Sequence, residues 1–127
     1  MPLESGMMGY PDHFEILYEL DTNLSMDKSR QPDKVLSINQ WNHVRNTLTK
    51  HGVSILTLPS AGPGVPDFTF IANAGLLIPG TNVFILSNFH HEERMREIPH
   101  LKHWLKNFFE LRELAPDEKF EGGGDPF

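Results

Sequence analysis

The chain has no cysteine among its 127 residues. This absence excludes disulfide bonds, thiolate metal sites and catalysis by a cysteine nucleophile within the chain. Basic residues are also scarce, because 11 Lys and Arg stand against 17 Asp and Glu and the formal net charge is −6. Binding to a phosphate backbone needs a concentrated basic surface, so we expect no nucleic-acid partner.

Long hydrophobic runs are absent as well. No window approaches the roughly 18–20 apolar residues of a membrane span, and the first residues lack the basic flank and apolar run of a secretion signal. We therefore expect a soluble, cytoplasmic chain with no membrane partner. Hydrophobic residues make up 39% and charged residues 22% of the 127 residues, which suits one globular domain or part of one.

Apolar residues at helical spacing predict two helices. The first is expected to begin at a cap, Asp33 or Ser37, and to stop at His51-Gly52. The second is expected from Glu92 to about Asn107. Pro99 lies inside this second pattern and is the one residue that disfavours a helix there.

Short runs of branched and aromatic residues predict strands between turn signals. Five strands are expected, at residues 14–20, 53–58, 68–72, 82–87 and 109–114. With the helices they give the order β-α-β-β-β-α-β, which indicates a mixed α/β fold. Residues 1–12 are expected to form a flexible lead, and residues 1–127 a single partial domain.

Asp67 and Asn73 flank one predicted strand. Each side chain is suited to face a pocket and to accept hydrogen bonds from a cationic donor array. A structural interpretation is also open, in which Asp67 caps a turn after Pro66 and Asn73 takes an unusual backbone angle before Gly75.

A second polar segment, residues 88–97, lies between a strand and a helix. Arg94 is suited to bind a carboxylate bidentately, and His90 and His91 to transfer protons. The zinc-protease pattern would need histidine where Met95 stands, so we expect no metal here. The alternative is a solvated run of charges at the start of a helix.

The third cluster is the glycine turn, residues 120–125. Its glycines permit a close backbone approach to a ligand, and they separate Glu121 from Asp125 by a short span. Paired acids at such a turn can hold a guanidinium, bind a cation or tune each other's pKa. The alternative is a flexible turn. His100 and His103 are at helical spacing, but surface histidines are commoner there than ligands, so we expect no metal and no cofactor.

These clusters together resemble the amidinotransferase superfamily of guanidino-modifying enzymes, which includes dimethylarginine dimethylaminohydrolase, arginine deiminase, arginine dihydrolase and glycine amidinotransferase. The resemblance extends over nearly the whole chain. It is carried, in order, by Tyr10-Pro11-Asp12-His13-Phe14 with Tyr18, Gln40-Trp41, Val65-Pro66-Asp67, Phe70-Ile71-Ala72-Asn73-Ala74-Gly75-Leu76, Phe89-His90-His91-Glu92-Glu93-Arg94 with Glu97, and Phe120-Glu121-Gly122 with Gly124-Asp125.

The resemblance implies the pentein fold, an α/β propeller of repeated ββαβ modules, of which this chain would hold about two and the start of a third. It also implies hydrolysis through a covalent amidino intermediate. By position, Glu121 matches the catalytic carboxylate that binds the guanidinium, and Asp67 an acid near the substrate. Asn73 matches the polar residue at the strand exit, Arg94 the arginine that grips the substrate carboxylate, and Asp125 the second acid of the glycine turn.

The sequence departs from the family pattern in three places. Asn73 stands where deiminases and dimethylarginine hydrolases usually carry Asp, which is similar to the Asn-Ala-Gly branch containing arginine dihydrolases. That branch has an Asn-Pro-Trp-Met-like segment where this chain has Asp21-Thr22-Asn23-Leu24. Family members also carry their catalytic histidine and cysteine after the glycine turn, whereas this sequence ends two residues beyond Asp125.

The sequence therefore predicts the N-terminal, substrate-binding part of a hydrolase acting on arginine or a methylated arginine, inactive as an isolated chain. The alternative is a non-catalytic guanidinium-binding or interaction module that self-associates or pairs with a partner chain. A third interpretation is a structural α/β protein whose acidic turn has no ligand. Exposed strand edges of an incomplete propeller favour association.

Overall fold

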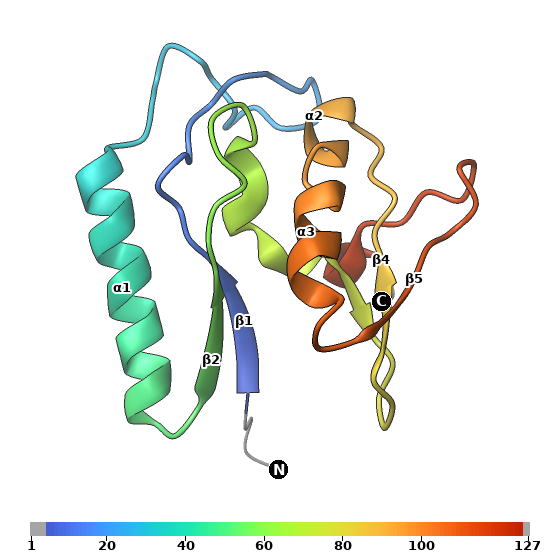
Figure 1. Ribbon diagram of the computed structural model, residues 1–127. Coiled ribbons are helices and arrows are strands. Elements are labelled where there is room, and N and C mark those ends of the chain that lie inside the picture. The colour runs from blue at the N-terminus through green and yellow to red at the C-terminus, as the bar shows by residue number, and fades with distance from the viewer. Residues whose placement is uncertain (1–4, 126–127) are drawn as a thin grey trace. The chain divides into compact units, whose positions relative to one another are not determined.

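The computed structural model describes residues 5–125, which divide into two compact units (Figure 1). Unit 1 comprises the described residues up to Thr69, and unit 2 begins at Phe70. The secondary structure is mixed α/β, as the sequence predicts. The propeller remains a prediction, as does the single partial domain.

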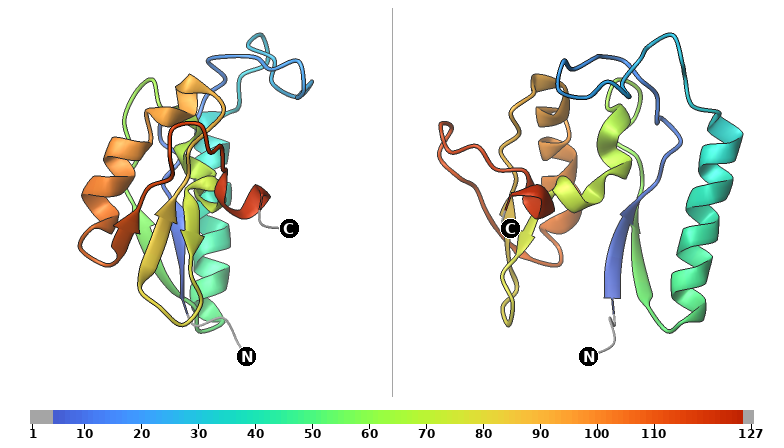
Figure 2. Two further views of the ribbon diagram at one scale, coloured as in Figure 1. Left: turned by 90° about the vertical axis from the view of Figure 1, so that its right-hand side faces the viewer. Right: turned by 180° about the vertical axis from the view of Figure 1, so that it is seen from behind.

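Unit 1 is a parallel pair of strands joined by a long helix. β1 (Ser5–Gly9) is followed by α1 (Lys34–Lys50), β2 (Ser54–Leu58) and the 3-10 helix η1 (Pro66–Thr69). β1 and β2 run in parallel along their whole length, and α1 lies beside the pair (Figure 2).

α1 ends where the sequence predicts, and of the two predicted caps, Asp33 and Ser37, the structure uses Asp33. The Asp33 carboxylate accepts a hydrogen bond from the Leu36 N–H at 2.9 Å, which satisfies one of the unpaired donors of the first turn. At the other end Gly52 has φ +87°, a conformation that ends a helix at little cost only for glycine. The predicted first helix is therefore confirmed with its cap.

Unit 2 contains a three-stranded sheet in the order β3-β4-β5. β3 and β4 are antiparallel, and β5 returns parallel to β4 after a helical crossover. The elements of unit 2 are η2 (Ile71–Asn73), β3 (Gly75–Leu77), β4 (Val83–Leu86), α2 (Glu92–Met95), α3 (Ile98–Leu105), β5 (Glu110–Arg112) and η3 (Gly122–Gly124).

The buried apolar residues of unit 2 come mainly from α3 and from the sheet. Ile98, Leu101 and Leu105 recur at helical spacing and are all buried, and on the sheet Phe84 is 4% exposed. Pro99 does not break the helix, because it occupies the second position of α3, where a backbone N–H has no partner within the helix. The predicted helix over 92–107 is thus two helices, separated at residues 96–97.

Two predicted strands are wrong. Residues 14–20 contain no strand, because the backbone of Ile16 bonds to the side chain of Gln31, at 2.9 Å through its N–H and 2.8 Å through its carbonyl. The predicted strand at 68–72 is part of two 3-10 turns, and β3 begins only at Gly75.

The first strand lies inside the predicted flexible lead. Of residues 1–12, residues 5–9 form β1, whose sequence has little strand propensity of its own and is held by the ladder to β2. Residues 1–4 lie outside the described part of the chain. Among residues 5–125 no helix combines the length and apolar character required to cross a membrane.

Candidate functional site

Four of the five predicted site residues are joined by hydrogen bonds in unit 2, and we call this set the array: Arg94, Asn73, Glu121 and Asp125. Arg94 Nη1 donates to Asn73 Oδ1 at 3.0 Å, and Asn73 Nδ2 donates to the Glu121 carbonyl at 3.3 Å. The backbone N–H of Glu121 then donates to Asp125 Oδ2 at 2.6 Å. The structure therefore brings together residues from η2, α2 and the glycine turn that lie far apart in sequence.

The glycine turn is fixed beside the end of β4 by a backbone bridge. Asn88 N–H donates to the Phe120 carbonyl at 2.8 Å, and the reciprocal bond is 3.1 Å. The Asn88 side chain also donates to the carbonyls of Ala115, Pro116 and Glu118 at 3.0–3.3 Å, which holds the loop before the turn. The turn is therefore tied to the sheet, in contrast to the flexible turn considered as an alternative.

Gly122 is required by the packing of this turn. Its φ is +55°, and a Cβ at this position would lie 2.7 Å from the Ala72 carbonyl oxygen and from the Asn73 carbonyl carbon. Real Cβ atoms do not approach backbone so closely, so only glycine fits. The sequence predicts a close backbone approach to a ligand at this turn. The close approach in the structure is to η2 of the same unit, and it brings Glu121 next to Asn73.

Arg94 is held by a buried carboxylate that the sequence interpretation did not single out. Its Nε and Nη2 donate to Glu97 Oε2 and Oε1 at 2.7 and 3.0 Å, and its side chain is 12% exposed against 2% for that of Glu97. The guanidinium also lies 4.4 Å from the Phe89 ring centroid and donates to the Phe70 carbonyl at 3.3 Å. The sequence signal was the three-residue spacing of Arg94 and Glu97 at a helix start.

Glu121 is the acid with the most distinctive surroundings. Partial burial raises its pKa, but the backbone N–H of His90, the His90 imidazole and the positive charge of Arg94 outweigh this effect. The pKa of Glu121 therefore lies below its ordinary value. Its Oε1 is 3.0 Å from both the N–H and Nδ1 of His90, whereas within residues 5–125 no donor bonds to Oε2.

Asp67 lies on η1 in unit 1, and 8% of its surface is exposed. It accepts a hydrogen bond from the Tyr18 hydroxyl, which links two of the segments on which the family resemblance rests. η1 packs at the end of β1, where a Cβ on Gly9 would lie 2.4 Å from the Phe68 carbonyl oxygen. The Asp67 carboxylate is thus buried and has a phenol as its hydrogen-bond partner, as buried polar groups require.

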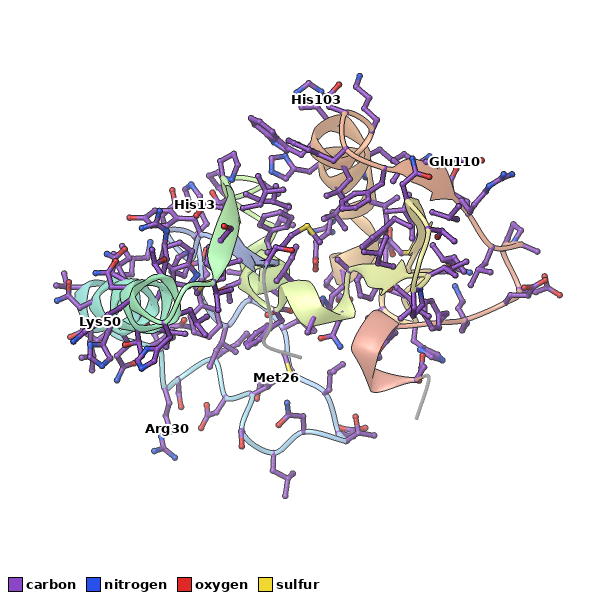
Figure 3. All side chains as sticks on the ribbon, turned by 90° about the horizontal axis from the view of Figure 1, so that it is seen from below. His13, Met26, Arg30, Lys50, His103 and Glu110 are labelled. Carbon is purple, nitrogen blue, oxygen red and sulfur yellow. The ribbon has the colours of Figure 1, made fainter. Side chains whose placement is uncertain are left out.

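Histidines and acids gather into no larger cluster in the part of the chain that the structure describes. No group of three or more His, Cys, Asp or Glu in residues 5–125 is placed to hold a metal ion. His100 and His103 flank the Trp104 ring at centroid distances of 6.4 and 5.5 Å, and His103 is exposed on α3 (Figure 3).

The array in unit 2 is suited to a planar cation that donates hydrogen bonds. An ionised carboxylate has one oxygen occupied by His90 and the other facing no protein donor among the described residues. Carboxylate–guanidinium bonds are charge-assisted and directional, so Glu121 Oε2 is the atom best placed to accept them. The lowered pKa keeps this acceptor ionised at neutral pH.

Comparison with known proteins finds enzymes of arginine metabolism. No family model matches the chain. The chain is 37% identical over 122 residues to the bifunctional arginine dihydrolase/ornithine cyclodeaminase ArgZ of Synechocystis sp., a match that covers 94% of this chain and 16% of ArgZ.

Solved structures agree. The crystal structure of the N-terminal domain of ArgZ bound to product, an arginine dihydrolase from cyanobacteria, matches with a TM-score of 0.80 and 31% identity, over 94% of this chain and 42% of that domain. A dimethylarginine dimethylaminohydrolase adduct matches with a TM-score of 0.73 and 18% identity, over 96% of this chain and 44% of that chain, which shows a shared fold. The chain thus spans less than half the length of each of these proteins.

Proposed function

The chain belongs to the amidinotransferase superfamily, whose N-terminal part it matches, and from this we propose that it binds the substrate of a hydrolase acting on the guanidino group of arginine or a methylated arginine. The observation that carries the proposal is the hydrogen-bonded array of Arg94, Asn73, Glu121 and Asp125, which presents an ionised carboxylate to a cation.

In this proposal Glu121 accepts N–H groups of the guanidinium and holds the group flat for attack at its carbon. Asn73 and Asp125 bond to the backbone on either side of that carboxylate and so fix the turn that carries it. Asp67 is assigned as an acid near the substrate on the resemblance of its Pro-Asp motif. Arg94 is assigned to the substrate carboxylate on the same ground.

The chain contains no cysteine, so the nucleophile of a covalent amidino mechanism is not supplied by these 127 residues. We therefore propose that the isolated chain binds without turning over. The test is an assay for citrulline, ornithine and ammonia after incubation with arginine and with methylated arginines. Turnover above that of a Glu121→Ala control overturns the proposed inactivity.

Binding is tested separately by isothermal titration calorimetry with L-arginine. We expect a heat of binding that Glu121→Gln abolishes, because the amide removes the negative charge while keeping the shape of the side chain. Glu118→Gln is the matched control, since Glu118 is an exposed acid in the loop before the turn. Equal binding by the chain and by Glu121→Gln contradicts the proposed role of Glu121.

A second candidate function is a non-catalytic guanidinium-binding module that associates with itself or a partner chain. The absence of cysteine from the whole sequence favours it. Arginine binding together with a solution mass above that of one chain, measured by light scattering, supports this function. A monomer that neither binds arginine nor turns it over contradicts both functions.

A further inference from the structure

We propose that His90 is the positioning residue of the Glu121 carboxylate, holding Oε1 with its backbone N–H and its imidazole Nδ1 so that Oε2 is presented to the guanidinium. This inference rests on the proposed function and adds to it a role for the exposed imidazole next to the acid. The role requires that His90 contacts the carboxylate itself, and the hydrogen bonds of the array show this.

The other members of the array hold the backbone of Glu121. Asn73 Nδ2 bonds to its carbonyl at 3.3 Å, and Asp125 Oδ2 accepts its N–H at 2.6 Å. Neither bond restricts rotation of the side chain. Among residues 5–125, hydrogen bonds to the carboxylate oxygens come from His90 alone, at 3.0 Å from the backbone N–H and 3.0 Å from Nδ1.

The backbone of His90 is fixed from both sides. The bridge between Asn88 and Phe120 holds the segment before it next to the glycine turn, and Phe89 is fully buried. His91 then begins α2 as its N-cap residue. The imidazole of His90 is therefore attached to a fixed point although its side chain is 53% exposed.

The two oxygens of the Glu121 carboxylate therefore have different roles. An oxygen has two lone pairs, and Oε1 faces two donor positions of His90, so its capacity is filled when Nδ1 carries a proton. A guanidinium must then bind at Oε2. Without the imidazole, Glu121 is expected to rotate among several rotamers and to lose part of its binding energy in becoming ordered.

The arrangement fixes which imidazole nitrogen is protonated. A carboxylate only accepts hydrogen bonds, so neutral His90 must carry its proton on Nδ1 to bond with Oε1. When His90 is doubly protonated, its positive charge next to Oε1 opposes a second cation at Oε2. The groups of positive charge that face Glu121 are His90, when its imidazole is protonated, and Arg94, and Asp125 lies at its backbone.

The first experiment needs no ligand. Long-range ¹H–¹⁵N spectra of the labelled 127-residue chain report the tautomer of His90, and ¹³C spectra report the titration of the Glu121 carboxyl. We expect neutral His90 in the Nδ1–H form, and a Glu121 pKa that rises in His90→Ala but stays lower in His90→Asn, whose amide donates from a similar position. The Nε2–H form, or an unchanged Glu121 pKa in His90→Ala, overturns the inference.

The second experiment is titration with L-arginine at several pH values from mildly acidic to neutral. We expect affinity of the chain to fall as His90 is protonated, affinity of His90→Asn to vary less with pH, and affinity of His90→Ala to be about tenfold weaker, as for a lost hydrogen bond to a charged group. His91→Asn is the matched control and is expected to titrate like the unaltered chain. An identical pH profile in His90→Asn overturns the inference.

The two experiments separate the failures. If the chain binds no arginine at all while His90 shows the Nδ1–H tautomer and controls the Glu121 pKa, the proposed function fails and the positioning of the carboxylate stands. If arginine binds equally well to His90→Ala and to the unaltered chain, the positioning role fails and the proposed function stands.

Discussion

The main helices of the two units are stabilised in different ways. α1 in unit 1 has 17 residues and none of them is buried, whereas α3 in unit 2 has 8 residues and buries Ile98, Leu101 and Leu105. α1 is defined by local signals, its Asp33 cap and the Gly52 stop. α3 is defined by the burial of its apolar face. Helix length in this chain therefore says little about how much a helix contributes to a core.

Unit 2 also contains a buried ion pair between Arg94 and Glu97. This pair holds the arginine from which the hydrogen-bonded array extends to the glycine turn. Exposed large apolar side chains occur in both units, with Leu24 at 93% in unit 1 and Phe108 at 54% in unit 2. Four of the five residues assigned to the substrate belong to unit 2, whereas Asp67 belongs to unit 1.

The chain's two tryptophans allow the units to be followed separately. Trp41 lies in α1 and Trp104 in α3. Trp41→Phe therefore leaves a fluorescence signal from unit 2 alone, and Trp104→Phe leaves one from unit 1 alone. Urea unfolding in these two backgrounds measures how each change below acts on its own unit and on the other.

The largest effect is expected from Glu97→Ala. The change leaves the guanidinium of Arg94 in a mostly buried position without its bidentate partner, which costs about 3–5 kcal/mol of unfolding free energy. Urea unfolding followed through Trp104 measures the loss. Glu92→Ala, an exposed acid on α2, is the control and is expected to change little. A loss below about 1 kcal/mol contradicts a structural role for the pair.

The contrast between the helices is tested directly by Leu101→Ala and Leu36→Ala. Leu101 is fully buried, so its truncation is expected to cost about 2–5 kcal/mol through lost burial and a cavity. Leu36 is 53% exposed on α1, and its truncation is expected to stay within about 0.5 kcal/mol. Equal losses, measured by urea unfolding in the two tryptophan backgrounds, show that α1 packs as closely as α3.

Glycines with positive φ give a third comparison. Gly64→Ala in unit 1 meets no atom within 4 Å and is expected to cost about 1–2 kcal/mol for its φ of +83° alone. Gly122→Ala adds a contact with the backbone of η2 and is expected to cost about 2–3 kcal/mol. Thermal unfolding measures both. A smaller loss for Gly122→Ala than for Gly64→Ala shows that the turn moves away from η2 without strain.

The smallest effect is expected from Glu121→Gln as the pH changes. Because the folded chain lowers the pKa of Glu121 below its ordinary 4.5, the ionised group stabilises the fold above that pH and this stabilisation is lost as the pH falls through the folded value. The free energy of unfolding of the variant is therefore expected to be lower than that of the unaltered chain near neutral pH and to approach it in acid. Urea unfolding at several pH values checks this, and a difference that grows in acid contradicts it.

Local signals were sufficient for several elements. The cap and stop of α1 and the apolar runs of β2, β4 and β5 predict these elements close to their observed bounds. The family resemblance is also confirmed, because it rests on short motifs that are legible in the chain without knowledge of its packing. The assignments of Asp67, Asn73, Arg94, Glu121 and Asp125 to substrate remain predictions.

Strand pairing was not predictable from propensity. Residues 14–20 have the composition of a strand, but the backbone of Ile16 bonds to the side chain of Gln31. Residues 5–9 have a composition unfavourable for a strand, yet their backbone pairs with β2. A strand is stabilised by its neighbour, and the neighbour is chosen by contacts distant in sequence.

The sequence by itself determined where α1 ends, the family and the types of residue available to bind a cation, since stop signals, motifs and charges are local properties. The tertiary structure decided which of these residues meet. His90 as the partner of Glu121 and the close approach of Gly122 to η2 each depend on contacts between segments that are distant in sequence and meet only through packing. The absent cysteine is fixed by the sequence, whereas the orientation of the acid that would hold a guanidinium is fixed by the fold.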